Sequence, residues 1–242
     1  MERKHFLKSL LMGAASAPVL LTACGKDEVS PTSSGTTGTT TTTTGGSSTT
    51  NCTVAPTETE GPFPTHTPSS YVRSDITDGR TGYKLTTKIT ITSSSASCAA
   101  LAGALVDIWH CDAEGNYSEY GGTGMQSTNY TSVHFLRGRQ TTDAAGLVTF
   151  TSIFPGWYSG RATHIHVHVY SASGTSLKVT QIAFPEGTGT ALAAVNGYAK
   201  GLSGYTYNKS DNVFSDDTAG IEIATVTGDT TNGFVLTMNI AV

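Results

Sequence analysis

Short runs in which apolar and polar side chains alternate recur along the second part of the chain. A period of two residues is typical of a strand with one buried face, because successive side chains of a strand point to opposite sides. Branched residues are frequent in these runs, and glycine- and serine-rich segments separate them, as expected for strands joined by turns. The pattern predicts strands at residues 84–92, 104–111, 147–154, 164–170, 177–184, 221–226 and 234–242.

Helical periodicity is confined to residues 190–200, and a helix there would be short. Several short strands with frequent turns and at most one short helix predict an all-β domain folded as a β-sandwich. This domain would occupy residues 52–242, which are enough for a single core. It contains no internal repeat.

Residues 1–23 have the pattern of an export signal. Basic residues precede an apolar run that is too short to span a membrane. The Leu-Thr-Ala-Cys-Gly sequence at residues 21–25 resembles a bacterial lipobox, in which Cys24 becomes the lipidated first residue. We therefore expect an exported bacterial lipoprotein, anchored to a membrane and facing the periplasm or the cell exterior. An ordinary signal peptide with a chance cysteine is the alternative.

We expect residues 24–51 to comprise the lipidated Cys24 and a tether. From residue 30 onward this segment contains only Pro, Thr, Ser, Gly and one Asn. Because it has no apolar side chain and no charge, it cannot bury surface, and we expect a flexible linker. Such a linker would span roughly 25 Å in root-mean-square terms.

The net charge excludes one class of partner. Removal of residues 1–23 would lower the formal charge from −4 to −6. An acidic domain without a basic cluster is a poor candidate for binding nucleic acid.

The cysteines predict a disulfide, because an exported protein folds in an oxidising compartment. Besides Cys24, the chain has Cys52, Cys98 and Cys111. We favour a bridge between Cys52 and Cys98, with Cys111 buried in its strand. A bridge from Cys111 to either of the others stays open.

Residues 155–166 carry the most informative chemistry of the chain. A Pro-Gly turn is followed by Tyr158, Arg161 and the alternating pair His164 and His166. On a strand the two histidines share one face about 7 Å apart, so their imidazoles can converge on one metal ion. The turn allows Tyr158 to return to the same place. The pattern predicts a metal site, with partly exposed strand histidines as the alternative.

A second segment, residues 105–117, adds to this prediction. It reads as a strand followed by a turn and Tyr117. A tyrosine after a turn is usually surface or core filler. Its importance here comes from its combination with residues 155–166.

Together these segments resemble the intradiol ring-cleavage dioxygenases, the family of protocatechuate and catechol dioxygenases. The resemblance covers residues 52–242, and its matching segments are residues 59–63, 109–117, 139–156, 158–166 and 180–184. It implies a sandwich of transthyretin-like topology with long loops.

The resemblance also implies that Tyr117, Tyr158, His164 and His166 bind Fe(III). Phenolates are hard anionic donors, and a strong cation can ionise phenols whose ordinary pKa is about 10. Imidazoles complete the set with neutral nitrogens. No Asp or Glu adjoins the histidine pair, whereas ferrous oxygenases use two histidines and a carboxylate.

The activity implied by the resemblance is the insertion of both atoms of O2 into a catechol. The ring is cleaved between the two hydroxyl-bearing carbons, which yields a cis,cis-muconate-type diacid. Arg161 would place a fixed cation over the ring where charge develops. Gln181 would contact the reacting oxygen or the ring.

Two other functions are compatible with the sequence. One is a non-catalytic β-sandwich binding lipoprotein, which would have no need of all four candidate ligands and Arg161. The other is a copper or zinc protein that uses His164, His166 and His168. If iron is the metal, we favour a structural role for His168 over one in second-layer contacts or proton transfer.

The spacing between Tyr158 and His164 suggests how large the substrate is. Only five residues separate Tyr158 from His164, which is fewer than in well-known members of the resembling family. A shorter loop favours an open pocket for larger or attached catechols.

Overall fold

The computed structural model describes residues 53–242. The chain divides into two units, Met1–Ser47 and Ser48–Val242, and the second contains all the described residues. The predicted export signal at residues 1–23 and the predicted tether at residues 24–51 lie outside the described residues. Within residues 53–242, no helix is both long and apolar enough to cross a membrane.

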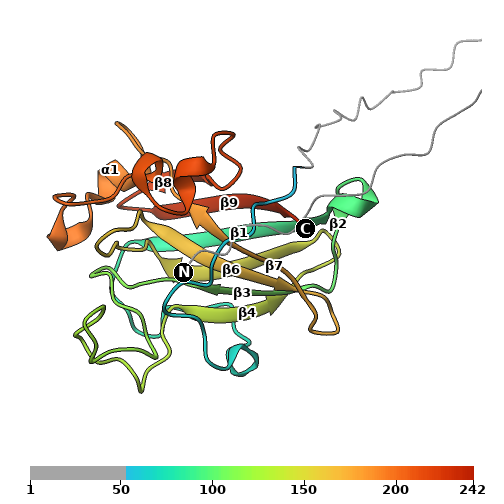
Figure 1. Ribbon diagram of the computed structural model, residues 1–242, viewed down its shortest axis with the longest axis horizontal. Helices are drawn as coiled ribbons and strands as arrows, with labels where there is room; N and C mark the ends of the chain where they lie inside the picture. Colours follow the sequence, from blue (N-terminus) through green and yellow to red (C-terminus); the bar gives the residue numbers. More distant parts are fainter. Residues whose placement is uncertain (1–52) are drawn as a thin grey trace, which may run out of the picture. The chain divides into compact units, whose positions relative to one another are not determined.

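Two β-sheets pack face to face, as Figure 1 shows. The first consists of β1 (Lys84–Ser93), β2 (Ala99–Ala100), β5 (Leu147–Ile153), β8 (Thr225–Asp229) and β9 (Gly233–Ala241). Its order is β2-β1-β9-β8, and β5 pairs with β1. The second sheet has the order β4-β3-β6-β7, with β3 (Leu105–Trp109), β4 (Arg137–Thr141), β6 (His164–Tyr170) and β7 (Ser176–Ala183). The predicted all-β sandwich is confirmed.

The helical content of the described residues is small. The α-helix is α1 (Ala191–Val195), and the 3-10 turns are η1 (Pro68–Ser70), η2 (Ser94–Ala96), η3 (Tyr198–Lys200), η4 (Asn208–Ser210) and η5 (Phe214–Asp216). The helix predicted at residues 190–200 is therefore shorter than expected. It ends because Asn196 and Gly197 adopt the left-handed conformation, with φ of 51° and 64°.

Two parts of the strand prediction are wrong. Alternation does not predict β4, because its sequence, Arg-Gly-Arg-Gln-Thr, lacks alternating apolar residues. This strand forms by pairing along β3, and Arg139 Nη2 donates to Asp107 Oδ2 on that strand over 2.7 Å. The strand predicted at residues 221–226 instead begins at Thr225, and Ile223 forms only an isolated bridge to Ala183.

The two faces of β6 have different environments. Ile165, Val167 and Val169 point into the core between the sheets. The three histidines of β6 lie on the other face but are also buried, because loops cover that face. Figure 1 shows the long β3–β4 loop and the segment around α1 gathered at one end of the sandwich. The three histidines therefore lie on a covered strand face and not on a solvent-exposed one.

The cysteines agree with the disulfide prediction as far as the described residues reach. Cys98 is disulfide-bonded, and Cys111 is a buried free thiol. Cys52, the partner that we favour for Cys98, lies outside the described residues.

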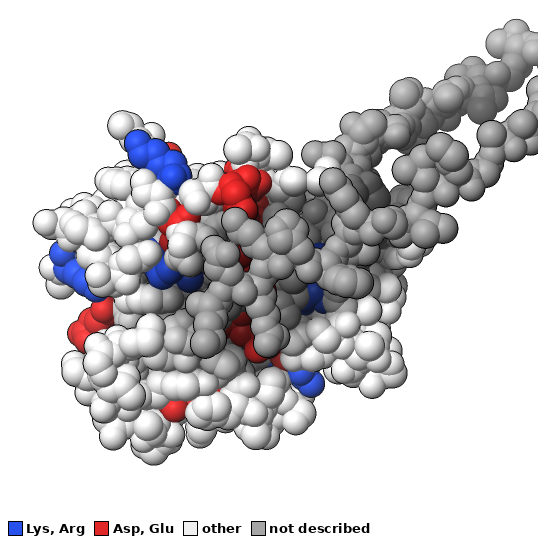
Figure 2. Space-filling view, in the orientation of Figure 1, with Lys and Arg blue, Asp and Glu red and all other residues white. Residues whose placement is uncertain are grey.

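The surface carries few charges on the face drawn in Figure 2. Basic side chains are separate from one another there and alternate with acidic ones. The part of that face that grey atoms do not cover therefore shows no continuous basic patch for a nucleic acid.

Candidate metal centre

Four side chains from two segments converge beneath the loops. Tyr117 Oη lies 3.2 Å from His164 Nε2, which lies 3.1 Å from His166 Nε2. The ring of Tyr158 is 5.8 Å from that of Tyr117 and 5.7 Å from that of His164, measured between centroids. The structure thus brings together all four residues that the sequence proposes as ligands.

The hydrogen bonds of the two imidazoles decide which nitrogens face the centre. His164 Nδ1 lies 2.6 Å from the carbonyl oxygen of Ala162. Because a carbonyl only accepts, Nδ1 carries the proton and Nε2 keeps a free lone pair. His166 Nδ1 is buried and has no hydrogen-bond partner, and its Nε2 points toward His164. Both histidines therefore present Nε2 to the centre.

This donor set fits a metal ion. Donors at right angles around a metal, with bonds of about 2.0–2.1 Å, lie about 3 Å apart. The separations around His164 Nε2, 3.1 and 3.2 Å, are close to that value. Two phenol oxygens and two imidazole nitrogens would suit a hard, highly charged cation such as Fe(III).

Burial sets the protonation of these groups. It raises the pKa of Tyr117 well above its ordinary value and also raises that of Tyr158, where the charge of Arg161 opposes it. Burial also lowers the pKa of His164 to about 3 and that of His166 well below its usual range. The histidines are thus neutral lone-pair donors, and the phenols ionise only if a nearby cation stabilises the phenolate.

The turn after β3 brings the two tyrosine segments together. Asp112 closes this turn, since its Oδ1 accepts from the N–H groups of Glu114 and Asn116. Its carbonyl oxygen also accepts from Gly156 N over 3.0 Å. A Cβ on Gly115 would lie 2.2 Å from the carbonyl oxygen of Trp157, so the close approach of the two segments requires glycine.

The segment of residues 59–63 closes the site from another side. Gly61 lies against the ring of His166, where a Cβ would approach Cε1 to 2.9 Å. Phe63 stacks on Tyr117 with ring centroids 4.8 Å apart. His166 also stacks parallel to Trp109, with ring centroids 4.9 Å apart. Two of the candidate ligands are thus held in place by ring packing.

Arg161 and Gln181 lie beside the donors in one hydrogen-bonded chain. Arg161 Nη2 donates to Gln181 Oε1 over 2.7 Å, and Gln181 Nε2 donates to the Thr59 carbonyl over 2.9 Å. Arg161 lowers the pKa of Tyr158 through its charge and side-chain hydrogen bonding, against the larger effect of burial, which raises it. The register of β6 and β7 places Gln181 opposite His166. Both residues proposed from the sequence therefore adjoin the centre.

Asp211 is a residue of this site that the sequence does not reveal. Its carboxylate is buried and accepts from Arg161 Nε over 2.9 Å and from Ala162 N over 2.6 Å. Burial alone would lower the pKa of Arg161, but the hydrogen bond and charge of Asp211 raise it above its ordinary value. Asp211 follows Arg161 by 50 residues in an irregular segment, and no local motif marks it.

His168 does not face the centre. Its Nδ1 lies 2.9 Å from Glu60 Oε1 and its Nε2 lies 2.8 Å from Ser176 Oγ. Its ring stacks on Tyr170. Within the described residues, no three His, Cys, Asp or Glu side chains are placed to hold a metal. The three histidines of β6 thus do not form the site that a copper or zinc protein would need.

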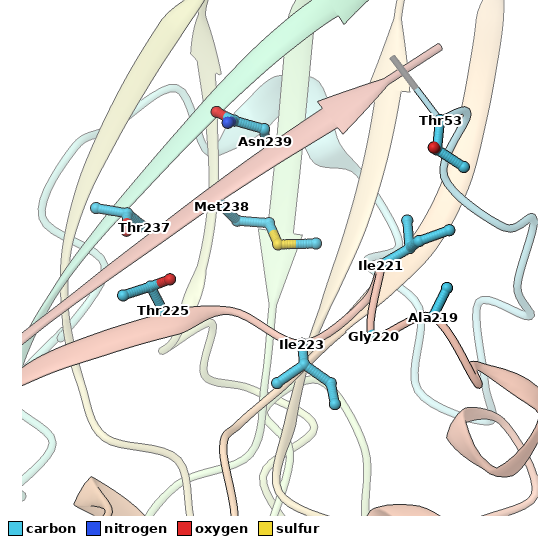
Figure 3. Close-up of a pocket in the computed structure, with 9 residues that line it drawn as sticks. All are labelled: Thr53, Ala219, Gly220, Ile221, Ile223, Thr225, Thr237, Met238 and Asn239. Atoms are coloured by element: carbon cyan, nitrogen blue, oxygen red, sulfur yellow. The ribbon is translucent and has the colours of Figure 1, made fainter. Parts of the chain in front are cut away.

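A separate cavity of about 270 Å³ lies over β8 and β9, as Figure 3 shows. Thr225, Thr237, Met238 and Asn239 contribute to its lining, together with the segment around Ile221. None of its lining residues is titratable, and none belongs to the candidate centre. It has no part in the chemistry of that centre.

Comparison with known proteins identifies the family. The Dioxygenase_C family model, described as dioxygenase, matches residues 60–212, a span that contains the four candidate ligands, Arg161, Gln181 and Asp211. The protein therefore belongs to the intradiol ring-cleavage dioxygenase family, and this membership indicates an oxidoreductase. No curated protein matches the sequence.

Solved structures agree with this assignment. An intradiol ring-cleavage dioxygenase from Tetranychus urticae is 28% identical, with a TM-score of 0.68, and the match covers 78% of this chain and 94% of that one. The dioxygenase domain of a carbohydrate-binding fusion protein from Streptomyces sp. SirexAA-E is 25% identical, with a TM-score of 0.55 and coverage of 78% and 98%. Hydroxyquinol 1,2-dioxygenase from Pseudomonas putida shares the fold at 14% identity, a TM-score of 0.53 and coverage of 78% and 66%.

Proposed function

We propose that the protein is an Fe(III)-dependent intradiol dioxygenase that cleaves catechol-type rings. The observation that carries this proposal is the convergence of the Tyr117 phenol oxygen and two imidazole nitrogens on one buried point, with the ring of Tyr158 beside them. A binding module has no need of such a set. The overall reaction adds both atoms of O2 to the catechol and gives a cis,cis-muconate-type diacid, so no external reductant is required.

Fe(III) held by Tyr117, Tyr158, His164 and His166 would supply a Lewis acid for the catechol oxygens. The protein then has to accept the catechol protons. Tyr158 is suited to this task, because it is only partly buried, unlike Tyr117, and receives a hydrogen bond from Arg161. As one of the groups that would hold Fe(III), its phenolate oxygen could also accept a proton from a catechol hydroxyl.

Arg161 would hold a positive charge beside the ring as negative charge develops there. Asp211 and Gln181 fix two of its nitrogens, so the guanidinium does not have to reorganise during the reaction. The loops and Phe63 cover Tyr117, His164 and His166, which are buried, and leave Tyr158 partly exposed.

The decisive experiment is the visible spectrum of the purified protein, recorded with its iron content before and after anaerobic addition of catechol. We expect a broad tyrosinate-to-Fe(III) band that moves to longer wavelength when catechol binds. The Tyr117→Phe/Tyr158→Phe double variant is the control and should lack the band. A wild-type protein that stays colourless after reconstitution with Fe(III) would contradict the proposal.

The product provides a second test. With 18O2, both labelled atoms should appear in the ring-opened diacid, as expected for a dioxygenase. A panel of catechol, protocatechuate, hydroxyquinol and larger alkyl or aryl catechols tests the open pocket suggested by the short loop before β6. Turnover of only the smallest carboxylated substrate would contradict that part of the proposal.

We also propose that the enzyme is a lipoprotein anchored through Cys24 and faces the periplasm or the cell exterior. The support is the lipobox-like sequence at residues 21–25. Metabolic labelling with a fatty acid should mark the wild type and not Cys24→Ser. Labelling of the variant, or no labelling of either protein, would refute the anchor.

A further inference from the structure

The side chain of Gln126 is hydrogen-bonded to the backbone of Tyr117. Its Oε1 accepts from Tyr117 N over 2.7 Å, and its Nε2 donates to Tyr117 O over 2.8 Å. One amide side chain thus pairs with both backbone groups of one candidate ligand, as a neighbouring strand would. The same Nε2 also lies 2.9 Å from Tyr120 O and 3.2 Å from Thr128 O.

The surroundings make this contact important for the position of Tyr117. Tyr117 belongs to no strand, so no β-ladder fixes its backbone. Gln126 is 5% exposed, whereas its neighbour Met125 is 67% exposed. The loop around them is rich in glycine. Gln126 therefore anchors both this loop and the backbone of Tyr117.

We propose that Gln126 is a positioning residue that sets the place and direction of the Tyr117 phenolate at the metal centre. This inference rests on the proposed function, since it assigns Tyr117 to the metal. A ligand has to be held within about 0.5 Å of its productive position. Loss of a partner that orients a ligand typically costs about 10–100-fold in metal affinity or activity.

Gln126→Glu is the sharpest variant, because it keeps the size of the side chain. A carboxylate can still accept from Tyr117 N, but it cannot donate to the three carbonyl oxygens that the amide satisfies. Gln126→Ala removes all four contacts. Met125→Ala is the control for the loop, and Gln140→Glu is the matched control, since Gln140 donates to the Thr149 carbonyl away from the centre.

The measurement is made in a Tyr158→Phe background, in which Tyr117 is the remaining phenolate. We expect Gln126→Glu to displace the tyrosinate-to-Fe(III) band and to lower Fe(III) affinity by about 10-fold or more in competition with a chelator. Both controls should keep the band and an affinity within about twofold of the parent. Circular dichroism and thermal unfolding verify that each variant is folded.

Two results would overturn the inference. The first is a folded Gln126→Glu variant whose band and Fe(III) affinity equal those of the parent, which would leave the proposed function intact. The second is a wild-type protein without a tyrosinate band, which would overturn the proposed function as well. If Gln126→Ala does not fold, Gln126→Glu alone decides between these outcomes.

Discussion

The proposed ligands Tyr117 and Tyr158 would offer the same kind of donor atom, a phenol oxygen, from different environments. Tyr117 is fully buried, whereas Tyr158 is partly exposed and receives a hydrogen bond from Arg161. We predict that Tyr117→Phe lowers Fe(III) affinity more than Tyr158→Phe, because the buried phenolate is screened less from the cation. Tyr158→Phe should mainly lower kcat, since it removes the proposed proton acceptor.

Chelator competition and steady-state kinetics on both variants check this difference. The exposed Tyr207→Phe, which lies outside the donor set, is the control. Retention of full kcat by Tyr158→Phe would remove Tyr158 from the proposed proton transfer.

Asp211 provides a second prediction at the scale of single residues. Asp211→Asn keeps the shape of the side chain but leaves the Arg161 charge without its buried partner. Loss of one partner of a buried pair can destabilise a protein by about 3–5 kcal/mol. We expect lower stability and a kcat reduced by about 10–100-fold, in the range found for other outer-layer contacts.

The tyrosinate-to-Fe(III) band separates this effect from a loss of metal. It should persist in Asp211→Asn, because Asp211 contacts Arg161 and not the donors. The control is Asp229→Asn, whose carboxylate caps an exposed turn. Unchanged kcat in a folded Asp211→Asn would mean that Arg161 needs no partner to be positioned.

The proposed ligands could be predicted from the sequence, but their supports could not. His164 and His166 stand out because they alternate on one strand, and Tyr158 because it follows the turn before them. Asp211 and Gln126 reach the site through loop conformations that have no local pattern. Local spacing thus indicated Tyr158, His164 and His166 as candidate ligands, and the family resemblance added Tyr117, whereas the groups that orient them depend on tertiary structure.

The segment of residues 59–63 permits a prediction at the scale of a structural element. Gly61 has φ of +68°, and a Cβ there would lie 2.9 Å from His166 Cε1. Gly61→Ala should therefore cost about 1–2 kcal/mol through the left-handed backbone. It should in addition lower Fe(III) affinity, because the methyl group pushes the His166 ring away.

Gly79→Ala is a close control for this experiment. Gly79 has φ of +77°, yet nothing lies within 4 Å of a Cβ built there. Chemical denaturation should show a similar loss of stability in both variants, while only Gly61→Ala loses Fe(III) affinity. Equal Fe(III) affinities would show that residues 59–63 do not hold His166 in place.

Strands differ in how well their sequences predict them. The alternation in β6 predicts its limits correctly at residues 164–170, because one face meets the core and the other carries the histidines. β4 has no such alternation. Its first residue, Arg137, is buried, and its guanidinium donates hydrogen bonds to Ser118 Oγ and to the Phe63 carbonyl. A strand whose buried side chain is charged is stabilised by tertiary contacts that its own sequence does not reveal.

At the scale of the whole molecule, the sequence predicts the fold class but not the order of the strands. β1 pairs in parallel with β9, which lies at the other end of the domain sequence. The alternation within β1 or β9 does not specify this partner. The two-sheet arrangement thus follows from local pattern, whereas the order within each sheet depends on long-range pairing.

His110 links the two sheets and permits a prediction about the stability of the whole domain. Its Nε2 lies 2.7 Å from Ser152 Oγ of β5, and its Nδ1 lies 2.8 Å from the Cys111 carbonyl beyond β3. Burial lowers the pKa of His110 from 6.5 to about 4. The folded state therefore keeps His110 neutral over a range in which the unfolded chain binds a proton.

The sign of the pH dependence follows from this difference. Between about pH 6.5 and 4 the unfolded state binds more protons, so stability is complete above this range and falls as the pH decreases through it. The slope from one such group is at most about 1.4 kcal/mol per pH unit. Because glutamine cannot be protonated, His110→Gln should remove the part of the pH dependence of stability that comes from His110. The parts that come from His164 and His166 should remain. Denaturation of the wild type and of His110→Gln at several pH values measures this difference. Equal slopes of stability against pH would mean that His110 binds protons equally in the folded and unfolded chains. That result would contradict its burial between the sheets.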